Sequence, residues 1–108
     1  MAEWVKKEGY ETKLLADERD LNLKGTQMQL VRFTKGKHEH YHERKTEIYY
    51  FLKGKGKVII DGSKKKITPG SFFMIKPNAR HIFLNEGKGP LEAIMLKTNN
   101  SPADTYQD

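Results

Sequence analysis

The sequence predicts an all-β fold, a sandwich or barrel of short strands. Its apolar residues come in short runs that are rich in β-branched and aromatic side chains. These runs are MQLVRF (28–33), EIYYFL (47–52), KVIID (57–61), SFFMI (71–75), HIFL (81–84) and LEAIML (91–96). Segments with Gly, Pro or Asn separate them at intervals of about ten residues, which is typical of all-β domains. No helical pattern lies between the runs, so an α/β fold is not expected.

Two hairpins are expected within this pattern. The segment EIYYFLKGKGKVIID (47–61) predicts a strand, a Gly-rich turn and a second strand. The pair Asp61-Gly62 in VIIDGSKKKI is a strong signal for a type I′ turn, because both central residues of that turn need a positive φ.

The run IYYFL is apolar at consecutive positions, so both faces of this strand need burial. Two packed sheets, or a sheet and a subunit interface, can provide it. If Glu47 points inward, Tyr49 and Phe51 point inward too. The outward set is then Ile48, Tyr50 and Leu52. This set is a candidate subunit contact, or a surface that packs under the protein's own loops.

The 108 residues fit one domain, 1–108. We expect a core at about 26–98, with residues 1–25 forming an edge strand and loop, and residues 99–108 an irregular tail. A chain this short buries a modest core, so a homodimer is expected. It has no cysteine, no apolar run near the roughly 18 residues of a membrane span, and no apolar stretch like a signal peptide at its start. A cytoplasmic protein without membrane association is therefore the expectation.

The charge balance is basic, with 20 Lys+Arg against 14 Asp+Glu and a net charge of +6. Lysine dominates, and its densest stretches, KGKGK (53–57) and DGSKKK (61–66), contain glycines. Lysines at such hairpin ends solvate the turn and blunt edge strands. The smaller alternatives are nucleic acid or an anionic substrate, but no arginine cluster or aromatic motif supports nucleic-acid binding.

The segment HEHYHERKTE (38–47) holds three of the four histidines. His38, His40 and His42 alternate, so on a strand they share one face. Glu47 has the opposite parity, so a common site requires a break in the strand between His42 and Glu47. His81, which opens HIFL, could face them from another strand. Solvated surface histidines are the ordinary alternative, but a shared inward face favours a metal, because imidazole and carboxylate are metal ligands.

Two spaced motifs carry a family resemblance. The first is written G-x5-H-x-H-x(3,4)-E-x6-G, and His40-x-His42, four residues, Glu47, six residues and Gly54 fit it. Thr34 stands where its opening glycine would be.

The second motif is written G-x5-P-x-G-x2-H-x3-N. Its spacing is kept from Gly70 through His81 to Asn85, with Lys76 in place of the proline and Asn78 in place of the glycine. Asparagine tolerates a left-handed backbone better than most residues. With both motifs in order, the sequence resembles a small single-domain cupin.

This resemblance implies a double-stranded β-helix, or jelly-roll barrel, that is usually dimeric and holds a metal in its mouth. The implied ligands are His40, His42, Glu47 and His81. His38 has no counterpart in the motif and is expected at the rim or behind the ligands. Asn85 is expected to have a structural role.

Such a ligand set accepts one divalent transition metal, and Fe, Mn, Ni, Zn and Cu all suit it. The leading hypothesis is a metal-dependent enzyme on a small molecule, either a dioxygenase or a sugar or keto-acid isomerase. A non-catalytic module that binds a sugar or another small ligand is the alternative. His38 is a candidate proton carrier, and Tyr49 and Phe51 are candidate pocket walls. Arg80 is a candidate clamp for a carboxylate or phosphate, or else a solvated loop residue.

Overall fold

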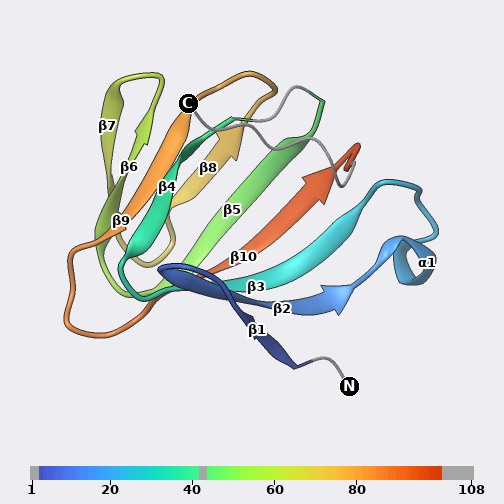
Figure 1. The fold of residues 1–108 in the computed structure, drawn as a ribbon, viewed down its shortest axis with the longest axis horizontal. Helices are drawn as coiled ribbons and strands as arrows, with labels where there is room; N and C mark the ends of the chain where they lie inside the picture. Colours follow the sequence, from blue (N-terminus) through green and yellow to red (C-terminus); the bar gives the residue numbers. More distant parts are fainter. Residues whose placement is uncertain (1–2, 42–43, 101–108) are drawn as a thin grey trace.

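Two antiparallel sheets form the molecule. The computed structural model describes residues 3–41 and 44–100, and the side chains of these residues except 36–40. One sheet has six strands in the order β1-β2-β3-β10-β5-β8, and the other has four in the order β4-β9-β6-β7. Figure 1 shows β6, β7 and β9 at one side of the molecule, and β5, β10, β3 and β2 fanned across the other. The predicted all-β, jelly-roll fold is confirmed.

The strands are short, as the spacing of the apolar runs predicted. The six-stranded sheet contains β1 (Trp4–Lys6), β2 (Tyr10–Ala16), β3 (Gln27–Phe33), β10 (Leu91–Thr98), β5 (Thr46–Lys53) and β8 (Phe72–Ile75). The four-stranded sheet contains β4 (Gly36–His40), β9 (His81–Asn85), β6 (Gly56–Ile60) and β7 (Ser63–Ile67). No helix in the described part of the chain is long and apolar enough to cross a membrane.

One predicted hairpin is confirmed and the other is wrong. β6 pairs with β7, and Asp61 (φ 48°) and Gly62 (φ 83°) have the positive φ values of a type I′ turn. β5 and β6, however, belong to different sheets, so KGKG is a crossover rather than a hairpin turn. Both of its glycines are sterically required, because a Cβ on Gly54 would lie 2.6 Å from the Pro90 carbonyl oxygen and one on Gly56 would collide with the Leu84 carbonyl.

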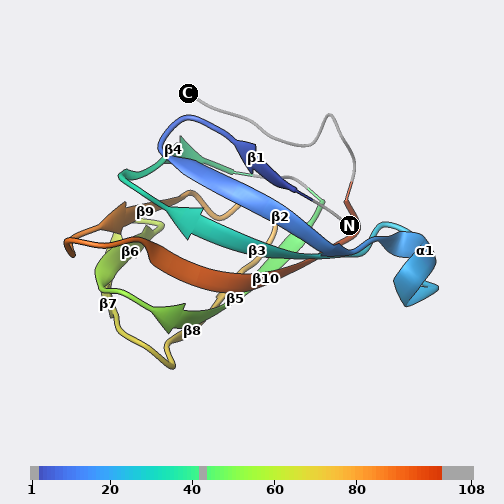
Figure 2. The same ribbon diagram turned by 90° about the horizontal axis from the view of Figure 1, so that it is seen from below.

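The N-terminal segment contributes two strands and one helical turn. β1 is an edge strand of the larger sheet, and β2 pairs with β3. The helix α1 (Glu18–Leu21) is capped by Asp17, whose carboxylate accepts from two backbone N–H groups in a capping box with Asp20. A single turn is too short to show a helical period, so the sequence did not predict it. Figure 2 shows α1 at the end of the molecule away from β6 and β7.

An aromatic core fills the space between the sheets. Its central rings are Phe33, Tyr49, Phe51 and Phe83. The ring centroids of Phe33 and Phe83 are 5.0 Å apart, and those of Tyr49 and Phe83 are 4.5 Å apart. The predicted alternation in β5 is confirmed, because Tyr49 and Phe51 are buried whereas Tyr50 and Leu52 are exposed. Rings in contact across both sheets lock the sheets together.

Candidate metal centre

A glutamate and a histidine from opposite sheets meet in the interior. Glu47, on β5, is 2% exposed, and His81, on β9, is fully buried. His81 Nε2 lies 3.6 Å from Glu47 Oε1. Burying two such groups is costly unless their polar atoms are satisfied, so this contact makes the position a candidate site.

The other nitrogen of His81 is fixed by the backbone. Nδ1 lies 3.1 Å from the Ala79 carbonyl oxygen, which can only accept, so Nδ1 carries the proton and donates it. When the ring is neutral, this tautomer leaves a lone pair on Nε2, the nitrogen that lies 3.6 Å from Glu47 Oε1. Two acceptor atoms that face each other are stabilised by a cation between them. Metal-bound histidines are held through their second nitrogen in the same manner.

The donor atoms fit a divalent transition metal. Ligand atoms about 2.1 Å from one metal, at ordinary bond angles, lie roughly 3.0–3.4 Å apart, close to the separation seen here. An imidazole nitrogen and a carboxylate oxygen also belong to the donors that these metals prefer. A proton on Nε2 would satisfy the same pair as an ion pair, so the metal content of the protein decides between the two.

The remaining predicted ligands lie on or after β4. The backbone register pairs His40 of β4 with His81 of β9, so the two residues are cross-strand neighbours. His38 is on the same strand, and the side chains of both residues are outside the described part, as is the whole of His42. Among the residues whose side chains are described, there is no group of three metal-binding side chains. The four-ligand set therefore stays a prediction.

The predicted break before Glu47 is present. β4 ends at His40 in the smaller sheet, and β5 begins at Thr46 in the larger one. On one uninterrupted strand, Glu47 would point away from the face that His40 shares. Because β5 lies in the other sheet, Glu47 instead faces the interior from the side opposite β4.

Two tyrosines surround the glutamate. The Tyr49 hydroxyl donates to Glu47 Oε1 at 3.1 Å, and burial together with the Glu47 charge holds the pKa of Tyr49 well above its usual value. Burial and the same carboxylate also raise the pKa of Tyr10. Both phenols therefore keep their protons and can donate. Tyr10 was missed, because nothing in the sequence indicated that β2 would bring its side chain to the core.

Further polar residues share the inner face beside Glu47. The cross-strand register places Lys97 opposite Glu47 and Gln27 opposite Lys97. Gln29 Nε2 donates to Gln27 Oε1 at 2.8 Å, and Lys45 is buried two residues before Glu47. The alternation of inward and outward side chains along β3 and β10 could have identified Gln27, Gln29 and Lys97 as inward-facing, once the strand order was known. They give this end of the interior a polar wall.

The other predicted pocket residues occupy different surroundings. Phe51 is a fully buried core residue. The Arg80 guanidinium carbon lies 4.6 Å from the Tyr41 ring centroid, in a cation–π contact. The Arg80 backbone N–H donates to Asp61 Oδ1 at 2.8 Å. Arg80 is thus held beside the start of β9, next to His81, and its role as a clamp stays a prediction.

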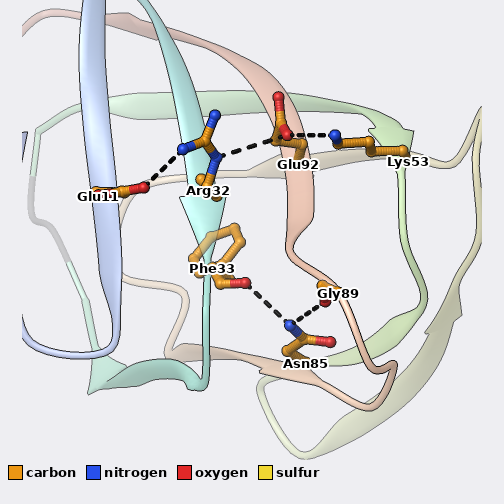
Figure 3. A network of polar contacts seen from close by, with 7 residues as sticks. All are labelled: Glu11, Arg32, Phe33, Lys53, Asn85, Gly89 and Glu92. Atoms are coloured by element: carbon orange, nitrogen blue, oxygen red, sulfur yellow. Dashed lines mark hydrogen bonds and ion pairs between the residues drawn. The ribbon is translucent and has the colours of Figure 1, made fainter. Parts of the chain in front are cut away.

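Asn85 ties three segments together, in accordance with its expected structural role. Its Nδ2 donates to the carbonyl oxygens of Phe33 (3.0 Å), Thr34 (3.2 Å) and Gly89 (2.9 Å). Its Oδ1 accepts from the Gly87 N–H at 2.9 Å. Figure 3 shows the amide between β3 and the loop that leads to β10. Asn78, which replaces a glycine of the motif, has a φ of 69°, as expected for a left-handed position.

Comparison with known proteins decides the family. A sequence model of the Cupin_2 family, the cupin domain, matches residues 29–97. The chain belongs to the cupin family. This cupin is 34% identical over 55 residues to the uncharacterized protein MJ1618 of Methanocaldococcus jannaschii, an alignment that covers 51% of the chain and 44% of that relative. The chain therefore aligns with less than half of the relative's length.

Solved structures share the fold of this cupin. A structure of Streptomyces PAC13 with uridine has a TM-score of 0.79 at 16% identity, covering 97% of this chain and 82% of that one. KdgF from Halomonas sp. has a TM-score of 0.78 at 22% identity, with 93% and 88% covered. A predicted oxalate decarboxylase from Thermotoga maritima has a TM-score of 0.76 at 21% identity, with 90% of each chain covered. At these identities the likeness is one of fold.

Proposed function

We propose that this cupin binds one divalent transition metal in its barrel and is a metal-dependent enzyme on a small polar molecule. The observation that carries the proposal is the buried pair of Glu47 Oε1 and His81 Nε2, 3.6 Å apart, with His81 oriented by the Ala79 carbonyl. The motif adds His40 and His42 as the other two ligands. The cross-strand pairing of His40 with His81 supports that assignment.

The residues around the pair have separable roles in this proposal. The Ala79 carbonyl holds the His81 ring so that Nε2 faces the ligand position. Tyr49 orients the carboxylate by donating to Glu47 Oε1. The bound metal would supply a Lewis acid, or a redox centre, with positions open to substrate. Ring and carboxylate are thus held in place before a metal binds, which lowers the cost of ordering them.

The inner wall supports a polar substrate. Gln27 and Gln29 offer amide groups, and Lys97 offers a positive charge, on the same face as Glu47. Proteins of similar fold include a nucleoside dehydratase and a sugar phosphate isomerase. Chemistry on a sugar or keto acid is therefore the leading class, and a dioxygenase or a non-catalytic binder is a distinct outcome of the tests below.

Metal content tests the first step. Wild type, Glu47→Gln, His81→Ala and His42→Ala would be reconstituted with Zn²⁺, Mn²⁺ or Fe²⁺, desalted, and measured by elemental analysis. We expect about one metal per wild-type chain and at least about tenfold less in each variant. Glu86→Gln is the matched control for Glu47→Gln, because the Glu86 side chain is 50% exposed and lies outside the site, and this variant should keep its metal. Equal metal in wild type and the ligand variants would show that the assignment is wrong.

Activity tests the second step. Metal-loaded protein would be assayed for oxygen uptake on small enols, diols and thiols, and by NMR for isomerisation or dehydration of sugars and keto acids. Conversion without oxygen uptake supports the leading class. Substrate-dependent oxygen consumption would replace it with a dioxygenase. Saturable binding without turnover would identify a non-catalytic module.

A further inference from the structure

The hairpin of β6 and β7 carries half of the net positive charge of the chain. Residues 57–66 contain four lysines and one aspartate, a net charge of +3 against +6 for all 108 residues. Three of these lysines, Lys64, Lys65 and Lys66, are exposed on β7, and we call them the β7 lysines. Lys57 lies directly opposite Lys66 in the register of the two strands. Like charges in opposite positions destabilise a strand pair, so an anion that lies close to this hairpin would stabilise it.

The acidic residues around the hairpin are engaged elsewhere. Asp61 Oδ1 accepts a hydrogen bond from the Arg80 backbone N–H at 2.8 Å. Glu86 Oε2 lies 3.3 Å from Lys57 Nζ. In the part of the chain that the structure describes, the β7 lysines form no ion pair. Their charge is therefore available to an anionic group from outside.

β7 is also an edge strand of the four-stranded sheet, and Figure 1 shows it at the margin of the molecule. The turn at residues 61–62 has two residues, so Ile60 and Ser63 are the hydrogen-bonded pair that closes it. Hydrogen-bonded and non-hydrogen-bonded pairs alternate along an antiparallel ladder. The backbone N–H and C=O groups of Lys64 and Lys66 therefore point away from β6, where another strand can bond to them.

We propose that the edge of β7 binds an acidic segment of a partner protein, which adds to the sheet as an extended strand. The backbone of the segment bonds to the outward N–H and C=O groups of Lys64 and Lys66. Its carboxylates lie beside the ammonium groups of the same two lysines, because residues opposite each other in a sheet share a face. Backbone bonds supply the affinity in this mode of binding, and the side chains supply the specificity.

The β7 lysines select against other occupants. A second copy of β7 would bring three lysines of its own to the edge, and like charges repel. Nucleic acid is disfavoured, because residues 56–67 contain no arginine for phosphate and no aromatic ring on which bases could stack. An anionic membrane would use the charge but leave the outward backbone groups unpaired. An acidic strand uses both features of this edge.

Fluorescence anisotropy with a labelled peptide tests the proposal. The probe is an acetylated peptide of alternating glutamate and valine, six residues long, which should bind wild type saturably at low ionic strength. Lys64→Gln combined with Lys66→Gln should weaken binding about tenfold, because two charge pairs are lost. The matched control is Lys7→Gln combined with Lys24→Gln, which removes the same charge from exposed lysines elsewhere and should leave binding unchanged. Circular dichroism shows whether each variant is folded.

N-methylated peptides separate strand addition from attraction by charge alone. In antiparallel pairing the glutamates lie opposite Lys64 and Lys66, so their N–H groups face β7 and those of the valines face solvent. N-methylation of the glutamates should weaken binding about tenfold or more, since each backbone bond contributes about 1 kcal/mol. N-methylation of the valines should weaken it much less. In hydrogen exchange followed by NMR, the unmodified peptide should slow the N–H groups of Lys64 and Lys66 but not that of Lys65, which faces β6.

Four results would overturn the proposal. The first is no binding of the peptide to wild type, and the second is binding that persists in the folded variant without Lys64 and Lys66. The third is equal binding of the two N-methylated peptides, because charge alone would then explain the contact. The fourth is tighter binding to a DNA duplex, or to vesicles that contain phosphatidylserine, than to the peptide. The inference does not depend on the metal, and metal-free protein should bind the peptide equally well.

Discussion

Changing Asn85 to aspartate should destabilise the protein strongly although it changes no side-chain volume. The amide donates to the carbonyls of Phe33, Thr34 and Gly89 and accepts from the Gly87 N–H. A carboxylate keeps the bond from Gly87 but cannot donate. It would face three carbonyl oxygens at 2.9–3.2 Å.

The magnitude follows from the bonds lost. An amide NH₂ group has two hydrogens, so two donated bonds disappear, each worth about 1 kcal/mol net. Carbonyls that lose their partner beside a negative charge add about 1 kcal/mol or more. We expect a loss of about 3 kcal/mol in the free energy of unfolding at pH 7, and a fall in Tm of about 12 °C for a domain of this size.

Urea denaturation followed by circular dichroism measures the effect, at one protein concentration for all samples. The control is Asn100→Asp, since the Asn100 side chain makes no hydrogen bond with other residues in the described part of the chain. The introduced carboxyl at position 85 should have a raised pKa in the folded state, so its deficit should shrink as the pH falls below that pKa. If Asn85→Asp unfolds within about 0.5 kcal/mol of the control, the structural role of this amide is refuted.

Three further changes probe the crossover, the candidate centre and the outer face of the six-stranded sheet. Gly56→Ala should lower the free energy of unfolding by more than about 3 kcal/mol, because the new Cβ collides with the Leu84 carbonyl. Gly62→Ala, which has open space around it, should lower it by about 1 kcal/mol in the same urea experiment. Equal losses in the two variants would contradict the packing argument. Tyr49→Phe should weaken metal binding about tenfold in a chelator competition, because Glu47 loses the hydrogen-bond donor that orients it. An unchanged metal affinity would show that Tyr49 has no role in metal binding. Glu92→Gln removes the carboxylate that lies 3.6 Å from Arg32 Nε and 3.1 Å from Lys53 Nζ. Because the Glu92 side chain is only 13% exposed, we expect a cost of about 1–2 kcal/mol that high salt reduces only in part. A cost that disappears in high salt would show that these contacts are ordinary surface ion pairs.

Local sequence signals predicted the strands and one turn. Short apolar runs between segments with Gly, Pro and Asn indicate strands, because they are too short for a helix and are bounded by turn residues. Asp61-Gly62 indicates a type I′ turn, because these two residue types readily adopt the positive φ that the turn requires. The same local reasoning failed at KGKG. A Gly-rich segment permits a tight turn. Whether β6 pairs with β5 depends on the strands that compete for it, and here β6 pairs with β7 and β9 of the other sheet.

The candidate site divides in the same way. The proposed ligands follow from the motif resemblance. The break before Glu47 and the inward direction of Tyr49 follow from the parity of positions along a strand, which the sequence contains. The contact between Glu47 and His81 does not, because they lie on strands of different sheets and meet only when the sheets pack.

Tyr10 and Lys97 required the tertiary structure for the same reason. Lys97 lies opposite Glu47 through the pairing of β10 with β5. Tyr10 lies opposite Phe33 through the pairing of β2 with β3. The sequence by itself therefore determined which side chains could share a face of a strand. Only the tertiary structure decided which faces meet, because strand order and sheet packing depend on contacts between residues distant in the chain.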